Sequence, residues 1–220
     1  MRIQPHDPDA IADFLEPTEF VNSDHGSIKK VVGDLKLPEL PPRERATTAF
    51  RFVRDEINYK FGAKKERDQY VASNILEARA GFCIQKAILL AALGRAAEIP
   101  TALVYCDYRE QTLHPSLVKT IGTNIMYYHG YVAFHLDGVW RSADATFSPD
   151  IAEKNHYRLV RFDGTGDALL APVTTDGKPH AEYLRVHGFF VDFPIAQMMK
   201  LVYDQYKDAG EDGLVALGIR

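Results

Sequence analysis

The sequence predicts a single α+β domain in which helices come first and antiparallel strands follow. Three observations support this fold class: helical periodicity up to about residue 100, strand-like runs with a hairpin signal after it, and no linker, repeat or low-complexity segment. A chain of 220 residues can also bury a core large enough to fold without disulfides or metal ions. We therefore expect one domain over residues 1–220.

The composition is typical of a globular protein and excludes several classes. The net charge is −4 and the basic residues are scattered, so no nucleic-acid partner is expected. Two cysteines are too few for a disulfide scaffold, which favours reduced thiols in the cytoplasm. The first residues, MRIQPHDPDA, have no signal-peptide character, and the longest apolar run, Ala87–Ala97, is too short to span a bilayer. We expect a cytoplasmic protein with no membrane partner.

The N-terminal part reads as an extended segment followed by two helices. Residues 1–22 mix proline, aspartate and apolar residues, and we expect an extended segment or an edge strand there. The capping pair Ser23–Asp24 predicts a short helix that continues to about Leu35. Pro42 suits the first turn of a second helix, in which apolar residues recur at helical spacing as far as Ile57.

The stretch from Gly81 to Pro100 predicts the central helix of the domain. A charged surface loop over 63–69 and a short helix around Ile75 lead into it. This helix is apolar on nearly every side, which is typical of a buried helix. Cys83 lies in its first turn, where unpaired N–H groups and the positive end of the helix dipole stabilise an anion. A nucleophilic thiolate is favoured at that position.

The remaining elements are mostly strands. Thr101–Cys106 predicts a strand, and a long surface loop is expected over 111–124. Strand-like pieces over Tyr157–Phe162 and Tyr183–Val191 alternate with turns, and Pro194 begins a last helix.

A β-hairpin supplies the groups that a catalytic thiol needs. Strands over Met126–Leu136 and Val139–Thr146 flank an Asp-Gly pair, which is a strong signal for a tight turn. A tight turn places residues whose numbers add up to about 275 opposite each other. His129 then lies near Asp144 after allowance for a bulge or a diagonal contact, within reach of a carboxylate–imidazole hydrogen bond.

These motifs together resemble the transglutaminase-like superfamily, which has a papain-like fold with cysteine, histidine and aspartate in this chain order. The resemblance rests on Gly-Phe-Cys before an apolar helix ending in Ile-Pro, a histidine on a strand, and then Trp140, Asp144 and Thr146 at the family's spacing. The run Val53–Tyr59 also looks like the family's helix end leading to a tyrosine. The resemblance covers about residues 47–148, with helices before it and a strand and helix extension after it.

The resemblance implies a central helix bearing Cys83, packed on an antiparallel sheet bearing His129 and Asp144. It implies a cysteine-dependent enzyme that transfers an acyl group from a peptide, protein or small amide through a thioester, without a cofactor or metal. Hydrolysis of the thioester is favoured over transfer to an amine, because nothing marks an acceptor site for a protein amine. Family position indicates Asn58 and Tyr59 as the segment of the second oxyanion donor.

The chain departs from the family pattern at two places. Glu98 precedes the Ile-Pro pair, where the family often has glycine, and Gly130-Tyr131 follows the histidine, where the family often has Ala-Trp. The second departure changes the wall beside His129. The resemblance also implies that Trp140 backs the site without reacting. Three aromatic residues on the same strand could line a cleft or serve packing alone: Tyr127, Tyr128 and Tyr131.

Other readings remain open. A binding module that keeps the fold without turnover is the alternative from another class, and an arylamine N-acetyltransferase is an alternative enzyme.

Cys106 is expected to be a core thiol. His129 and His135 are roughly 20 Å apart along one strand and cannot share a metal ion. The remaining histidines are expected at the surface or in satisfied contacts: His25, His114, His156, His180 and His187. The oligomeric state is left open.

Overall fold

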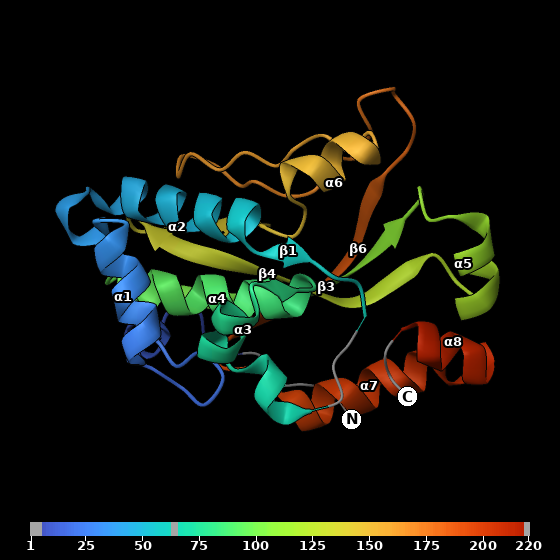
Figure 1. The fold of residues 1–220 in the computed structure, drawn as a ribbon, viewed down its shortest axis with the longest axis horizontal. Coiled ribbons are helices and arrows are strands. Elements are labelled where there is room, and N and C mark those ends of the chain that lie inside the picture. The colour runs from blue at the N-terminus through green and yellow to red at the C-terminus, as the bar shows by residue number, and fades with distance from the viewer. Residues whose placement is uncertain (1–5, 63–65, 218–220) are drawn as a thin grey trace.

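A computed structural model, which describes residues 6–62 and 66–217, has the predicted α+β architecture (Figure 1). A four-stranded antiparallel sheet with the order β5-β4-β3-β6 forms its centre. The strands are β3 (Thr101–Glu110), β4 (Ile125–Leu136), β5 (Val139–Ala143) and β6 (Ala181–Phe190). A separate parallel pair joins β1 (Asn58–Tyr59) to β2 (Ala80–Gly81).

In Figure 1, α1 to α4 lie in the left half of the view, α5 and α8 lie on the right, α6 lies above the strands and α7 lies below them. The helices are α1 (Gly26–Asp34), α2 (Pro42–Glu56), α3 (Ala72–Ala78), α4 (Cys83–Ala96), α5 (Pro115–Ile121), α6 (Pro149–Lys154), α7 (Ile195–Tyr206) and α8 (Gly210–Ala216). Short 3-10 turns are η1 (Ile11–Phe14), η2 (Leu37–Glu39), η3 (Arg67–Tyr70) and η4 (Lys207–Ala209). No helix in the described residues is long and apolar enough to cross a lipid bilayer.

Helix α4 is the buried centre that its sequence predicts. Every residue from Ile84 to Arg95 is buried, and the helix packs against α1, α2, α3 and the strands β3 and β4. Two of these buried residues are cationic, and backbone carbonyl groups accept their hydrogen bonds. The Arg95 guanidinium donates to the carbonyls of Glu16, Thr101 and Val191. Such bonds offset the cost of removing a cation from water.

The hairpin of β4 and β5 has the predicted register. Leu136 pairs with Val139, and the ladder continues regularly to Val132 and Ala143. The two turn residues, Asp137 and Gly138, have φ values of 51° and 80°, the left-handed conformation that a two-residue turn between twisted strands requires. Strand β5 ends at Ala143 rather than at the predicted Thr146, because the next backbone N–H donates to Ala168 instead of to β4.

A β-bulge interrupts β4 just before His129. His129 pairs with Cys106 of β3, but Met126 pairs with Tyr108, so two residues of β4 lie opposite Asp107 alone. One of the two, Tyr128, has a φ of 58°, which is an uncommon conformation for a bulky residue. The Asp107 carboxylate holds it by accepting a hydrogen bond from the Tyr128 backbone N–H at 3.1 Å.

Several expected elements differ from the structure. Residues 111–124 are not an open loop, because α5 forms there and packs against α8. Residues 157–162 form no strand. Residues 6–22 contain η1 and only a single bridge, from His6 to Phe189 of β6, in place of an edge strand. Residues 63–65 of the expected charged loop lie outside the described residues.

Local capping also differs from the expectation. Helix α1 begins after His25, whose ring accepts a hydrogen bond from the Ser27 backbone N–H, and not after Ser23–Asp24. His114 caps α5 in the same way through the N–H of Ser116. These two histidines therefore have satisfied structural contacts, as expected.

Candidate active site

The N-terminus of α4 carries Cys83 and is held by the residues around it. Gln85 accepts a hydrogen bond from the Phe82 backbone N–H at 3.2 Å and donates one to the carbonyl of Gln69 at 2.6 Å. The parallel pair of β1 and β2 fixes the chain just before, since Lys60 N–H donates to the carbonyl of Gly81. Cys83 is half-buried, and its backbone N–H belongs to the first turn, which has no intrahelical acceptor.

The structure brings His129 and Asp144 together, as the hairpin predicts. His129 Nε2 lies 2.7 Å from Asp144 Oδ2, and both side chains are almost completely buried. The second carboxylate oxygen accepts a hydrogen bond from the Thr146 backbone N–H at 3.0 Å. Asp144 therefore has fixed partners on both oxygens, and it orients the imidazole through Nε2.

Electrostatics make this pair an imidazolium and a carboxylate at neutral pH. Burial alone lowers the pKa of His129, but the Asp144 carboxylate and the Cys83 sulfur outweigh burial and raise it to about 10. Burial alone raises the pKa of Asp144, but the charge of His129 and the hydrogen bond from Thr146 outweigh burial and lower it. Cys83 lies close enough for its sulfur to raise the pKa of the same imidazole, whose Nε2 faces Asp144.

Gly130 allows β4 to approach the N-terminal end of α4. A Cβ atom at this position would lie 3.0 Å from Ile84 Cα and 3.4 Å from Ile84 N. Ile84 directly follows Cys83, so the contact sets the spacing between the strand that carries His129 and the helix that carries the thiol. This close approach is a physical reason for the glycine that stands where the family often has alanine.

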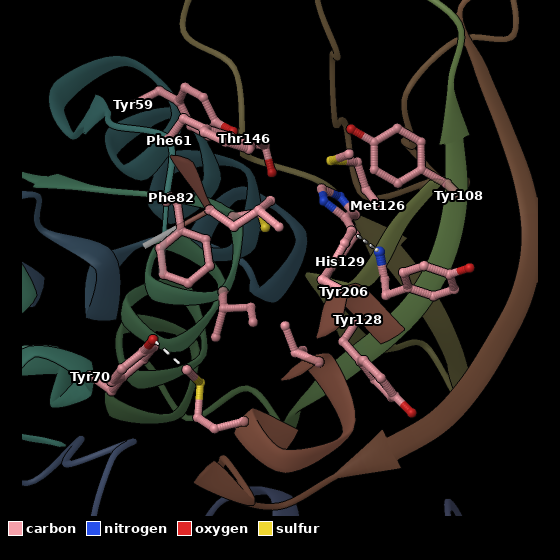
Figure 2. A pocket seen from close by; sticks show the side chains of 17 residues that line it. Tyr59, Phe61, Tyr70, Phe82, Tyr108, Met126, Tyr128, His129, Thr146 and Tyr206 are labelled. Atoms are coloured by element: carbon pink, nitrogen blue, oxygen red, sulfur yellow. Dashed lines mark hydrogen bonds between the residues drawn. The ribbon is translucent and has the colours of Figure 1, made fainter. Parts of the chain in front are cut away.

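One cavity joins the predicted residues to a ring of aromatic side chains (Figure 2). Tyr59, Phe61 and Phe82 stand on one side of the view, and Tyr108, Tyr128 and His129 stand opposite. The cavity has a volume of about 80 Å³. The remaining residues that line it are Gly62, Tyr70, Cys83, Ile84, Met126, Tyr127, Thr146, Met199, Val202, Tyr206 and Leu217. Of the three tyrosines that could line a cleft, Tyr131 is the one outside this lining.

Lys86 is a residue of the site region that the sequence reasoning missed. Its side chain is 1% exposed, and Nζ donates to the carbonyls of Ile57 at 2.8 Å and Arg54 at 3.2 Å. These carbonyls lie where α2 ends and β1 begins, next to the cavity residue Tyr59. Burial lowers the pKa of Lys86 to about 7, although Asp144 partly offsets the shift. A lysine in an otherwise apolar helix was the available signal.

Other expected residues lie away from the cavity. Cys106 is fully buried, and burial raises the pKa of its thiol, as expected of a core thiol. Trp140 does not back the cavity: its ring packs against Phe14 and Phe189, and its indole N–H donates to the carbonyl of Pro8. In the described part of the chain, no group of three or more His, Cys, Asp or Glu residues is placed to hold a metal ion.

Of the other histidines expected at the surface or in satisfied contacts, His187 and His180 have acidic partners. His187 Nε2 lies 2.9 Å from the Asp107 carboxylate that holds the bulge. His180 is buried, with Nε2 3.2 Å from Glu110 Oε2, and its ring stacks on Tyr157 at 4.1 Å. The His180 contact is an ion-pair distance without good hydrogen-bond alignment.

Comparison with known proteins gives a family match and two distant structures. The model of the transglutaminase-like superfamily matches residues 29–145. A candidate cysteine protease from Cytophaga hutchinsonii is 19% identical, with a TM-score of 0.49, over 83% of this chain and 55% of its own. The periplasmic domain of TgpA from Pseudomonas aeruginosa is 19% identical, with a TM-score of 0.44, over 64% of this chain and 48% of its own. No curated protein matches the chain. The chain thus spans about half the length of these solved chains.

Proposed function

The chain belongs to the transglutaminase-like superfamily, and from this premise we propose that it is a cysteine-dependent acyl-transfer enzyme that works through a thioester. The substrate is a peptide, a protein or a small amide, and no cofactor takes part. The observation that carries the proposal is the buried His129–Asp144 pair at 2.7 Å, whose histidine lines the same cavity as a cysteine at the start of a buried helix. A cytoplasmic location is part of this proposal, because two cysteines are too few for a disulfide scaffold.

In the proposed mechanism, Cys83 attacks the carbonyl carbon and His129 manages the proton. An imidazolium beside a sulfur favours the thiolate, which is the nucleophilic form. As the tetrahedral intermediate collapses, the C–N bond breaks and His129 gives its proton to the departing amine. Water then attacks the thioester while the neutral His129 accepts its proton, and the acid leaves with Cys83 regenerated. Asp144 keeps the imidazole oriented through both steps.

The oxyanion that forms in each step needs two donors. The Cys83 backbone N–H, at the first turn of α4, is the first donor in this proposal. The segment around Asn58 and Tyr59 supplies the second. Asn58 N–H donates to Arg79 and Lys60 N–H donates to Gly81, so Tyr59 is the residue of this segment left to face the cavity.

Hydrolysis is favoured over transfer to an amine. The described residues that line the cavity include no Asp or Glu that could hold the ammonium group of a lysine acceptor. A binding module without turnover remains the rival, but its function would not require a buried, charge-paired histidine beside the thiol. Burying such a pair is costly unless its charges are used or fully compensated.

Thiol alkylation tests the nucleophile. At pH 6 iodoacetamide should label Cys83 at least about 10-fold faster than it labels glutathione, because a free thiol near pKa 8.5 is barely ionised there. Buried Cys106 is the internal control and should remain unlabelled in the folded protein. The His129→Gln variant should lose the advantage. Labelling of Cys83 at the glutathione rate would contradict the ion pair.

Acyl-enzyme formation tests the reaction. A library of peptides and glutamine analogues is incubated with the protein, and the mass of a covalent adduct is sought by mass spectrometry. The adduct and any turnover should disappear in Cys83→Ala and persist in Cys106→Ala. Full turnover by Cys83→Ala would refute the assignment. Asp144→Asn should reduce kcat by about 10²–10⁴-fold, because the imidazole loses its orienting carboxylate.

A further inference from the structure

One wall of the cavity comes from the C-terminal part of the chain, beyond the region that the family model matches. Met199, Val202 and Tyr206 lie on α7, and Leu217 follows α8, whereas the family match ends at residue 145. The spacing of the first three residues places them on one face of the helix. The opposite face carries the exposed Lys200–Asp204 ion pair. Helix α7 thus presents a dedicated apolar face to the cavity that contains Cys83.

This wall is anchored to the sheet by specific hydrogen bonds. The Tyr206 hydroxyl donates to the carbonyl of Ile125 at 2.7 Å and accepts from the backbone N–H of Tyr127 at 3.1 Å. Both partners belong to β4, the strand that carries His129. Helix α8 is held as well, because Gly213 packs closely on the carbonyl of Thr120 in α5. Anchored residues of this kind can shape a cavity consistently.

The chemistry of the cavity favours an uncharged occupant. None of its described lining residues is Asp, Glu, Lys or Arg, and its His129 imidazolium is already paired with Asp144 and, in the proposed mechanism, with the Cys83 thiolate. A charged group entering the cavity would lose water without gaining an ion partner. The volume of about 80 Å³ is roughly half that of the ~150 Å³ apolar cavity that admits benzene. An aliphatic side chain therefore fits better than an aromatic ring.

We propose that the α7 wall makes this cavity a specificity pocket for an uncharged aliphatic side chain, of leucine or methionine size, next to the carbonyl that Cys83 attacks. The inference rests on the proposed function, since it takes Cys83 as the nucleophile. It assigns the segment outside the family match a role in choosing the substrate.

A matched series of peptidyl chloromethyl ketones tests the pocket. In each reagent the Cys83 sulfur bonds to the methylene carbon and chloride leaves, and only the side chain beside the ketone varies. The Leu and Met reagents should label Cys83 at least 10-fold faster than the Glu, Lys, Gln and Phe reagents. Equal rates across the series, or a preference for a charged, Gln or Phe side chain, would overturn the inference.

Iodoacetamide, which has no side chain to bind, separates the two levels of the argument. If it labels Cys83 rapidly at pH 6 while the peptidyl series shows no preference, the pocket inference fails and the proposed nucleophile stands. If iodoacetamide labels Cys83 only as fast as glutathione, the proposed function fails.

A pair of neighbouring variants locates the preference on α7. Val202→Lys places a cation in the pocket, and it should reduce labelling by the Leu reagent and raise labelling by the Glu reagent. Tyr203→Lys is the matched control, because Tyr203 is exposed and outside the lining; it should leave the ratio unchanged. If the lysine variant does not fold, the milder Val202→Thr replaces it. This variant should lower the ratio of the Leu to the Glu labelling rate several-fold. A folded Val202 variant with the wild-type ratio would overturn the inference.

Discussion

At the scale of single residues, the alignment of thiol and imidazole depends on a close approach between β4 and α4. Gly130 follows His129, and Ile84 follows Cys83. The backbones of Gly130 and Ile84 lie close together. The orientation of His129 is fixed separately, by Asp144 on the same hairpin. The distance between the Cys83 thiol and the His129 imidazole is therefore set by packing that a single added methyl group would disturb.

Gly130→Ala should slow the alkylation of Cys83 and also lower the stability of the fold. The new Cβ would lie 3.0 Å from Ile84 Cα, so the strand and helix must separate by a few tenths of an ångström. We expect a loss of about 1–3 kcal/mol of stability from overpacking, together with alkylation of Cys83 that is more than about 10-fold slower. Thermal unfolding and Cys83 alkylation rates measure the two effects.

Gly33→Ala is the control for this substitution. Gly33 lies in α1, and a Cβ atom added there would have no neighbour within 4 Å, so alanine should stabilise the helix by about 0.5–1 kcal/mol and leave alkylation unchanged. An unchanged alkylation rate in Gly130→Ala would contradict the role given to the glycine.

The sequence predicted the pair of His129 and Asp144 because a tight turn determines which residues face each other across a hairpin. Cys83 was predicted from its position at the start of a helix together with His129 and the motif from Trp140 to Thr146. Lys86 and Tyr206 were not predicted, because their partners are backbone groups of segments far away in the chain. No local pattern specifies which carbonyl a buried lysine or tyrosine meets. The same limit applied to Trp140, whose neighbours come from the N-terminal segment and β6.

At the scale of elements, Lys86 joins the catalytic helix to the junction of α2 and β1. The last carbonyls of a helix have no intrahelical donor, and the helix dipole favours a cation near them. Lys86 supplies both the donor and the charge from inside α4. The contact holds Tyr59, on β1, in its place beside Cys83.

Lys86→Met should destabilise the fold by about 1–3 kcal/mol, because the carbonyls of Arg54 and Ile57 lose their donor in a buried site. Urea unfolding at pH 7 measures the change. Lys30→Met is the control: Lys30 is 74% exposed in an ion pair with Asp34, so its loss should change stability by less than about 0.5 kcal/mol. Equal effects of the two variants would show that the buried contacts contribute nothing specific.

Elements with their own periodicity were predicted, and three short helices in the second half of the chain were not. Helices α5, α6 and α8 have only 7, 6 and 7 residues, too few to show a helical period. The strand-like run of 157–162 lacks a partner strand, because Arg54 donates to the carbonyl of Val160 and Phe162 stacks on Phe134. Its strand-like composition reflects burial and not sheet pairing.

At the scale of the whole molecule, two buried cations give stability opposite dependences on pH. His129 has a pKa of about 10 in the fold against 6.5 for the unfolded reference, so its contribution is complete below pH 6.5 and is lost as the pH rises towards 10. Lys86 has a pKa of about 7 against 10.5, so its burial cost is relieved as the pH rises from 7 towards 10.5. The two trends oppose each other between pH 7 and 10.

In a Cys83→Ala background, which removes the proposed thiolate, the free energy of unfolding should therefore change little between pH 7 and 9. With Lys86→Met added, the opposing contribution is gone, and stability should fall steadily over the same range. Urea titrations at pH 7, 8 and 9 compare the two proteins. A flat profile with Lys86→Met, or a steep one without it, would contradict the assignment of opposing contributions.

The split of the three proposed catalytic residues between two elements has a consequence for the newly made chain. His129 and Asp144 are close in sequence and meet within one hairpin, whereas Cys83 joins them only when α4 docks on the sheet. Contacts between distant segments form late in folding, because closing a long loop costs entropy first. During synthesis the chain thus carries an ordinary thiol, and the reactive form is delayed until the cavity around it exists.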